Sequence, residues 1–156
     1  MKLDSRGAGT ASNVVLVGVV GGGLLASRTR GNAAMMVNAV ALTSLTTEWT
    51  KALVHRSRPI MYSPQAPSVA GDRDSRRSFP SGHTATAFAV ATSYAVMAQR
   101  QHVPHATRNE ILLYAGAAGV GAMRVAAGRR FVTDVLGGAV LGAGIGWLTA
   151  NVFPTQ

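Results

Sequence analysis

Three groups of polar residues interrupt a mostly apolar chain and contain the side chains that could do chemistry. They are KALVHRSRP at positions 51–59, FPSGHTAT at 79–86 and RVAAGRRFVTD at 124–134. The groups hold lysine and arginine cations, histidine and one aspartate. A proton donor beside cations and free backbone N–H groups is the arrangement that general acid catalysis of phosphate ester cleavage requires. The residue types therefore predict a site for phosphate or a similar oxyanion.

The first group offers two cations. Lys51 and Arg58 are seven residues apart, close to two helical turns, so both can point to one side of a helix that Pro59 would end. Two cations on one face are suited to bind an anion. The alternative is that both side chains reach lipid headgroups at a membrane interface.

The second group offers a helix start and a proton donor. Pro80 suits the first turn of a helix, and Ser81 and Gly82 would present backbone N–H groups at its positive end, where oxyanions bind readily. His83 lies in the same turn and is the candidate general acid. A histidine alone at a membrane boundary is more often a solvated residue, but the neighbouring cations favour a catalytic role.

The third group adds a cation and a carboxylate. Arg124 is the cation, and Asp134 is the only acidic residue of the last apolar segment. A carboxylate buried there without a partner would be unfavourable. Arg130 precedes it by four residues, one helical turn, so we expect these two side chains to pair.

Five apolar segments must position these groups. Each has about 17 to 22 residues, close to the length of a helix that crosses ~30 Å of hydrocarbon. They are 11–27, 33–54, 80–98, 111–127 and 132–153. We therefore expect an all-α fold, a polytopic transmembrane bundle of about five spanning helices that forms one domain over residues 1–156. A signal peptide is the alternative for the first segment, but Leu24 stands where a small residue is expected before cleavage.

Five spans would bring the three polar groups together. The amino terminus, the long connection 55–79 and the turn 128–131 would share one side of the membrane. In the last segment Gly138, Gly142 and Gly146 recur every four residues, so they should lie on one face and pack closely against a neighbouring helix.

Composition favours a membrane protein over a nucleic-acid-binding one. Charged residues are 13% of the chain and apolar residues 47%, with a net charge of +9. The basic residues are not one stripe; they fall in short groups between apolar segments, which is typical of membrane rims and of a site for a small anion rather than a duplex. We expect membrane lipids as partners and no nucleic acid. The chain has no cysteine, which excludes disulfides and thiolate metal sites.

The order and spacing of the three groups resemble a known signature. Lys51-x6-Arg58-Pro59, then Pro-Ser-Gly-His at 80–83, then Arg124 followed by positions 130 and 134 is similar to the three motifs of the type 2 phosphatidic acid phosphatase and vanadium haloperoxidase superfamily. The resemblance implies a helical bundle, embedded in the membrane in the lipid phosphatases, and phosphatase action without a metal or other cofactor. The substrate would be a lipid phosphate or an isoprenoid diphosphate, and the location a bacterial inner membrane. A soluble, haloperoxidase-like protein is the alternative, disfavoured by the length of the apolar segments.

The resemblance also implies roles for the site residues. Lys51, Arg58 and Arg124 would hold the phosphoryl oxygens, together with Ser81 and the Gly82 backbone. His83 would protonate the leaving oxygen.

Arg130 is the main departure from the family pattern. The family has a histidine at that position, which attacks phosphorus to form a phosphohistidine, and Asp134 would orient its ring. A guanidinium stays protonated and cannot be the nucleophile. We expect hydrolysis to be lost or strongly reduced; the alternative is a catalytically silent protein that binds phosphate or a lipid headgroup. His55, one turn from Lys51, is the nearest substitute nucleophile, but the family geometry places that helix face at the phosphate oxygens. Met123 replaces a serine, a minor change.

Overall fold

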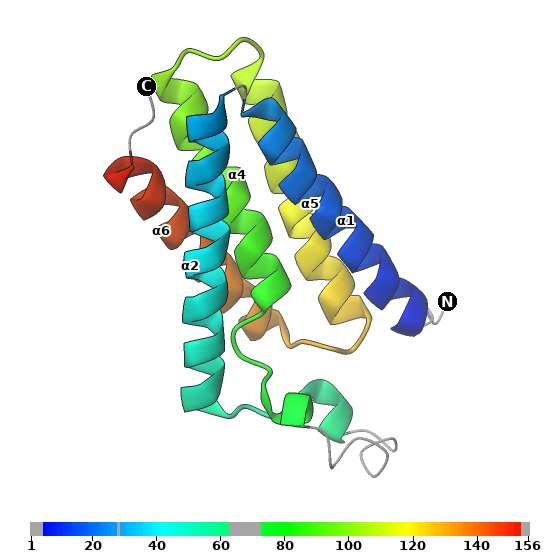
Figure 1. The fold of residues 1–156 in the computed structure, drawn as a ribbon. Coiled ribbons are helices and arrows are strands. Elements are labelled where there is room, and N and C mark those ends of the chain that lie inside the picture. Colours follow the sequence, from blue (N-terminus) through cyan, green and yellow to red (C-terminus); the bar gives the residue numbers. More distant parts are fainter. Residues whose placement is uncertain (1–4, 28, 63–72, 154–156) are drawn as a thin grey trace.

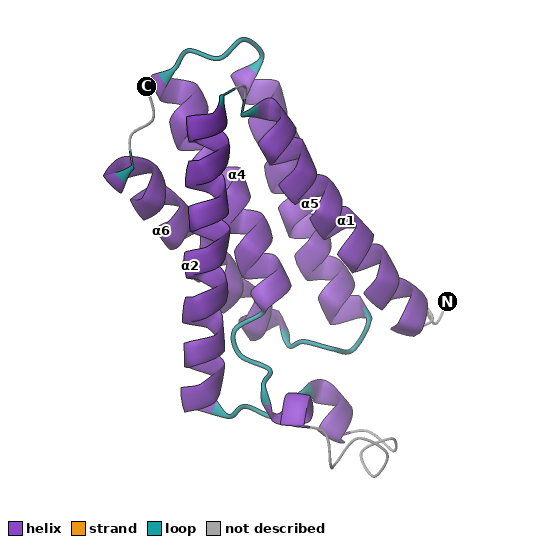
Figure 2. Cartoon of the chain, in the orientation of Figure 1, coloured by secondary structure: helices purple, strands orange, loops and turns teal. Residues whose placement is uncertain are grey.

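The computed structural model describes residues 5–27, 29–62 and 73–153. Within these residues the regular structure is helical (Figure 2). The elements in chain order are α1 (Ser5–Ala26), α2 (Arg30–Val54), the short 3-10 helices η1 (Pro59–Tyr62) and η2 (Arg73–Arg76), α4 (Gly82–Arg100), α5 (Ala106–Ala126) and α6 (Val132–Val152). Five long helices thus confirm the predicted all-α class for the part of the chain that is described.

Helix α4 is the centre of the bundle, and α1, α2, α5 and α6 all pack against it (Figure 1). Its buried residues are mostly small, with Ala85, Ala89 and Ala91 fully buried, so the neighbouring helices approach its backbone closely. Tyr94 is the largest fully buried side chain, and its hydroxyl accepts a hydrogen bond from Asn109 Nδ2 at 2.9 Å. A helix covered on all sides needs small side chains for packing rather than a lipid-facing surface.

Among the residues that the structure describes, two helices are long and apolar enough to cross a membrane by length and composition: Gly7–Ala26 in α1 and Val132–Val152 in α6. The sequence predicts five. The difference has a physical reason, because α2 contains Glu48 and Lys51 and α4 is rich in alanine, serine and threonine that pack inside the bundle. The outer faces of α1 and α6 nevertheless expose large apolar side chains, among them Val17, Val140 and Trp147. Apolar surface of this extent marks contact with lipid or protein rather than with water.

The glycine face of α6 packs against α4, as predicted. A Cβ atom built at Gly138 would lie 2.6 Å from the carbonyl oxygen of Ser81, and Cβ atoms at Gly142 and Gly146 would overlap the carbonyl oxygens of Ala85 and Ala89. Positions 138, 142 and 146 of α6 must therefore lack a side chain for the two backbones to touch. This contact fixes the start of α6 beside the start of α4.

The three polar groups meet at one end of the bundle (Figure 1). The amino-terminal end of α1, the carboxyl-terminal end of α2, the start of α4 and the α5–α6 connection all lie there. Ser81 N–H donates to the main-chain oxygen of Asp134 at 2.9 Å, which joins the second group directly to the third. His102 and His105 lie in the exposed turn at the opposite end.

Two local expectations are wrong. Helix α2 ends at Val54, because His55 adopts the left-handed conformation (φ 49°) and its N–H bonds back to Lys51 O. Arg58 therefore lies in the following connection, where its N–H donates to Ser75 O at 2.8 Å, and Pro59 begins η1 instead of ending α2. Pro80 is expected in the first turn of a helix, but it precedes α4, whose first helical residue is Gly82. The peptide bond between Phe79 and Pro80 is cis.

Candidate active site

Asp134 is fully buried at the first turn of α6 and accepts three hydrogen bonds from side chains and backbone. Arg56 Nη1 donates to Oδ1 at 2.8 Å. Ser78 Oγ and the N–H of Phe131 donate to Oδ2 at 2.5 Å and 2.9 Å. A buried carboxylate is stable only when it is paired and hydrogen-bonded, and these donors meet that requirement. The predicted need for a partner is confirmed, but the partner is Arg56.

Arg130 is buried beside this carboxylate but turns elsewhere. Its Nη1 donates to the carbonyl oxygens of Arg77, at 2.7 Å, and of Ser78. The expected Arg130–Asp134 pair is therefore wrong for the contacts between described residues. The reason is that α6 begins at Val132 with Phe131 as its N-cap, so Arg130 precedes the helix and the spacing of four residues is not one helical turn. The guanidinium instead fastens the connection before α4 to the start of α6.

Ser81 and Gly82 form the start of α4, next to Lys51. Ser81 is fully buried; its N–H donates to Asp134 O and its hydroxyl lies 2.9 Å from Thr84 Oγ1. The expectation that the Ser81 N–H is free for a ligand is therefore wrong, because this group holds α6. Gly82 lies next to the Lys51 ammonium group, because a Cβ atom built at Gly82 would be 3.3 Å from Lys51 Nζ. The Lys51 side chain therefore lies beside the amino-terminal, positive end of α4.

Lys51 already has a counter-ion inside the protein. Its Nζ lies 2.6 Å from Glu48 Oε1, and the other Glu48 oxygen lies 3.5 Å from Arg77 Nη1. Glu48 is half exposed, whereas Lys51 is nearly buried. The carboxylate therefore bridges two cations at the edge of the site, and an incoming anion would compete with it for Lys51.

His83 and Arg124 meet at the amide of Asn13, a residue of α1. Arg124 Nη2 donates to Asn13 Oδ1 at 2.5 Å, and His83 Nε2 lies 2.9 Å from the same atom. A guanidinium has no acceptor, so the Asn13 atom that faces it must be the amide oxygen. An amide oxygen only accepts, so His83 Nε2 must carry a hydrogen. His83, the candidate general acid, therefore carries a hydrogen on Nε2, the ring nitrogen that faces the Asn13 amide oxygen.

Four cations lie close enough to His83 to act on it electrostatically: Arg124, Arg130, Lys51 and Arg58. A cavity of about 260 Å³ opens beside it, lined by Leu16, Ser44, Thr47, Glu48, Lys51, Gly82, His83 and Thr86. Its walls come from α1, α2 and α4. The sequence-predicted residues Lys51, Gly82 and His83 therefore share one cavity, with Arg58, Arg124 and Arg130 within electrostatic range.

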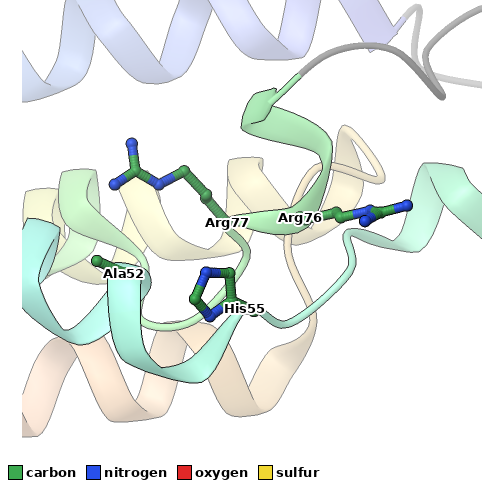
Figure 3. Close-up of a pocket in the computed structure, with 4 residues that line it drawn as sticks. All are labelled: Ala52, His55, Arg76 and Arg77. Atoms are coloured by element: carbon green, nitrogen blue, oxygen red, sulfur yellow. The ribbon is translucent and has the colours of Figure 1, made fainter.

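His55 lies outside this arrangement. It is exposed, and a different cavity, of about 360 Å³, has Ala52, His55, Arg76 and Arg77 as its described lining (Figure 3). Figure 3 shows Arg76 and Arg77 extending in opposite directions from the connection that faces the His55 ring. The position of His55 at the left-handed end of α2 gives no support to its use as a substitute nucleophile.

Comparison with known proteins agrees with this geometry. The sequence model of the PAP2 superfamily matches residues 32–156, which include α2, α4, α5 and α6. The chain belongs to the PAP2 superfamily. A crystal structure of a transmembrane PAP2-type phosphatidylglycerolphosphate phosphatase from Bacillus subtilis is similar, with 26% sequence identity and a TM-score of 0.70 over 95% of this chain and 75% of that chain. No curated protein sequence matches the chain. A PAP2 fold, a transmembrane neighbour and two apolar helices together indicate an integral membrane protein.

Several residues that build this candidate site were not predicted. Arg56 and Ser78 hold Asp134, and Glu48 pairs with Lys51. Arg56 lies within the first motif, but nothing in its spacing distinguishes it from other interfacial arginines. Asn13 lies on α1, before the first residue of the PAP2 match, so the family pattern contains no signal for it.

Proposed function

We propose that this chain is a membrane lipid phosphatase-family protein of a bacterial inner membrane whose site receives a lipid phosphate or an isoprenoid diphosphate. Lys51, Arg58 and Arg124 hold the phosphoryl oxygens, assisted by Gly82 at the start of α4. His83 is the proton donor. Because Arg130 stands where the family has its nucleophilic histidine, hydrolysis is lost or strongly reduced.

The position of Arg130 is the observation that carries this proposal. Its guanidinium is buried and donates to two main-chain carbonyl oxygens, so it is fully protonated and has no lone pair to offer phosphorus. Asp134, which would orient a histidine ring, is occupied by Arg56, Ser78 and Phe131. The chain thus retains the cations, the acid and the buried carboxylate but lacks the nucleophile.

The retained groups account for phosphate binding and for protonation of the leaving oxygen, but not for attack on phosphorus. Cations and helix-start N–H groups stabilise the negative charge on the phosphoryl oxygens. The Nε2 proton of His83 is available to the leaving alcohol or phosphate oxygen when the bond to phosphorus breaks. The bond that must form at the same time, between an attacking atom and phosphorus, has no donor at position 130. No metal or cofactor takes part in this scheme.

A second candidate function is binding without turnover, as a catalytically silent phosphate or lipid-headgroup protein. The four cations that act on His83 favour it, because Arg130 adds positive charge to the site while it removes the nucleophile. Charge-assisted hydrogen bonds from arginine to phosphate are among the stronger ones in proteins.

A phosphate release assay on phosphatidic acid, combined with lipid retention, tests the proposal. The purified protein in detergent should retain phosphatidic acid and release phosphate at or near background, and the Arg130→His variant should release it well above background. Equal release by both proteins would contradict the role given to position 130. Release by neither, with retention by both, would favour the binding function.

A further inference from the structure

The amide oxygen of Asn13 is shared by the two residues that should handle the substrate. Arg124 Nη2 and His83 Nε2 both point their hydrogens at Oδ1, from 2.5 Å and 2.9 Å. Asn13 belongs to α1, whereas the other proposed site residues lie on α2, α4, α5, α6 and their connections. Helix α1 thus reaches into a site that the other helices build.

We propose that Asn13 is a substrate-displaced residue whose amide oxygen occupies the position of a phosphoryl or leaving-group oxygen between Arg124 and His83. This inference rests on the proposed function, because it takes Arg124 as an oxyanion ligand and His83 as the proton donor. Asn13 competes with the anion and thereby sets the affinity of the site.

The chemistry of the two donors supports the exchange. A guanidinium N–H and an imidazole N–H that converge on one oxygen are the contacts that a phosphate ester oxygen would make when it is both stabilised and protonated. The amide oxygen is neutral. A phosphate oxygen carries negative charge, so its contact with the Arg124 guanidinium is an ion pair as well as a hydrogen bond, whereas the contact with the amide oxygen has charge on the donor alone. Phosphate therefore displaces the amide, while the empty site keeps both donors paired.

The surroundings of Asn13 leave room for that displacement. Asn13 lines a cavity of about 300 Å³, whose other described lining residues are Gly9, Thr10, Arg124 and Arg129. Asn13 is itself exposed. Helix α1 packs mainly on α5 and makes few contacts with α2, and Figure 1 shows the two helices diverging toward the site. The exposed side chain therefore has space in this cavity to move away from Arg124 and His83 without disturbing the core.

The inference is tested by calorimetric titration of the full chain, in detergent, with inorganic phosphate. Asn13→Ala removes one neutral hydrogen-bond acceptor, so phosphate affinity should rise about three- to tenfold. Asn13→Asp places a carboxylate against Arg124, so affinity should fall at least about tenfold, since an ion pair must now be broken. Val17→Ala, an exposed position one turn further along α1, is the matched control and should bind as the unaltered chain does.

A spectroscopic measurement follows the displacement directly and does not depend on the variants' affinity. The chain has five asparagines, so selective ¹⁵N labelling gives five side-chain amide signals, and the one missing in Asn13→Ala belongs to Asn13. Phosphate should shift this signal in the unaltered protein. If the chain binds phosphate while the Asn13 signal stays in place, or if Asn13→Ala binds phosphate equally or more weakly, the inference is wrong and the proposed function stands. If the unaltered chain binds no phosphate, the proposed function itself is wrong.

Discussion

The guanidinium of Arg56 lies 2.8 Å from the buried carboxylate of Asp134, across 78 residues of sequence. Arg56 also donates to Thr133 Oγ1 at 2.7 Å and stacks on the Phe131 ring, 4.6 Å from its centroid. One side chain from the connection after α2 thereby holds the start of α6. The carboxylate keeps a structural role in this chain although position 130 has no histidine to orient.

Arg56→Gln should destabilise the protein because it leaves the Asp134 carboxylate buried without its counter-charge. Removal of one partner from a fully buried ion pair lowers the free energy of unfolding by roughly 3–5 kcal/mol. The Arg56 side chain is 37% exposed, so water compensates in part, and we expect about 2–3 kcal/mol. Thermal unfolding in detergent measures the loss. Arg76→Gln, at an exposed arginine of the neighbouring connection, is the control; an equal loss in both variants would contradict the special role of Arg56.

Close packing between α4 and α6 predicts a difference between two glycines of the same helix. Gly142→Ala would push a methyl group into the carbonyl of Ala85, whereas a methyl group at Gly144 would meet no atom within 4 Å. Overpacking of this kind lowers stability by about 1–3 kcal/mol. Gly144→Ala should be neutral or slightly stabilising, because alanine favours the helix. Comparison of the two unfolding temperatures checks the prediction, which fails if both variants behave alike.

Much of the fold could be predicted from the sequence because it depends on periodic patterns. The five helices follow from apolar segment length, and the α4–α6 contact follows from glycines four residues apart. The end of α2 could not be predicted in this way. Seven residues separate Lys51 from Arg58, which fits two helical turns, but His55 leaves the helix and main-chain hydrogen bonds between residues 56–58 and 75–78 take over.

The sequence predicted the residues of the site more accurately than the contacts between them. Motif order placed Lys51, His83 and Arg124 at one end of the bundle, where the structure has them. Pairing depends on where helices begin: because α6 starts at Val132, Arg130 turns to carbonyl groups and Arg56 reaches Asp134 instead. Asn13 lies on a helix with no chemical motif, so only its position in space connects it to the site.

Anion binding should depend on the two arginines that we propose hold the phosphoryl oxygens. Arg124→Ala and Arg58→Ala each remove a charged donor, and hydrogen bonds to charged groups contribute about 1.5–3 kcal/mol. Phosphate affinity should therefore fall about ten- to a hundredfold in each variant. Calorimetric titration at constant ionic strength measures it. Arg108→Ala changes an exposed arginine at the opposite end of the bundle and should leave the affinity unchanged; unchanged affinity in all three variants would show that no cradle is formed.

Arg130→His should create phosphatase activity, and a second substitution, Asp134→Asn, should remove much of it. The peptide N–H that follows residue 130 donates to Asp134 Oδ2 at 2.9 Å, so the carboxylate lies next to the backbone from which the new ring would extend. One ring nitrogen would then donate to Asp134 and the other would attack phosphorus, as His83 protonates the leaving oxygen. Loss of a covalent nucleophile reduces rates by factors on the order of 10³ to 10⁶. We therefore expect Arg130→His to raise the rate of phosphate release by a measurable fraction of such a factor.

Two further variants separate nucleophilic catalysis from a change in packing. Arg130→Gln removes the same guanidinium contacts to Arg77 and Ser78 but supplies no nucleophile, so its phosphate release should remain at background. His83→Gln in the Arg130→His protein should lower the rate again, since the leaving oxygen then has no proton donor. A phosphoenzyme trapped by acid quench in Arg130→His, and missing in Arg130→Gln, would establish attack from position 130. If the unaltered chain hydrolyses phosphatidic acid as fast as Arg130→His, position 130 does not limit the reaction and the nucleophile must lie elsewhere.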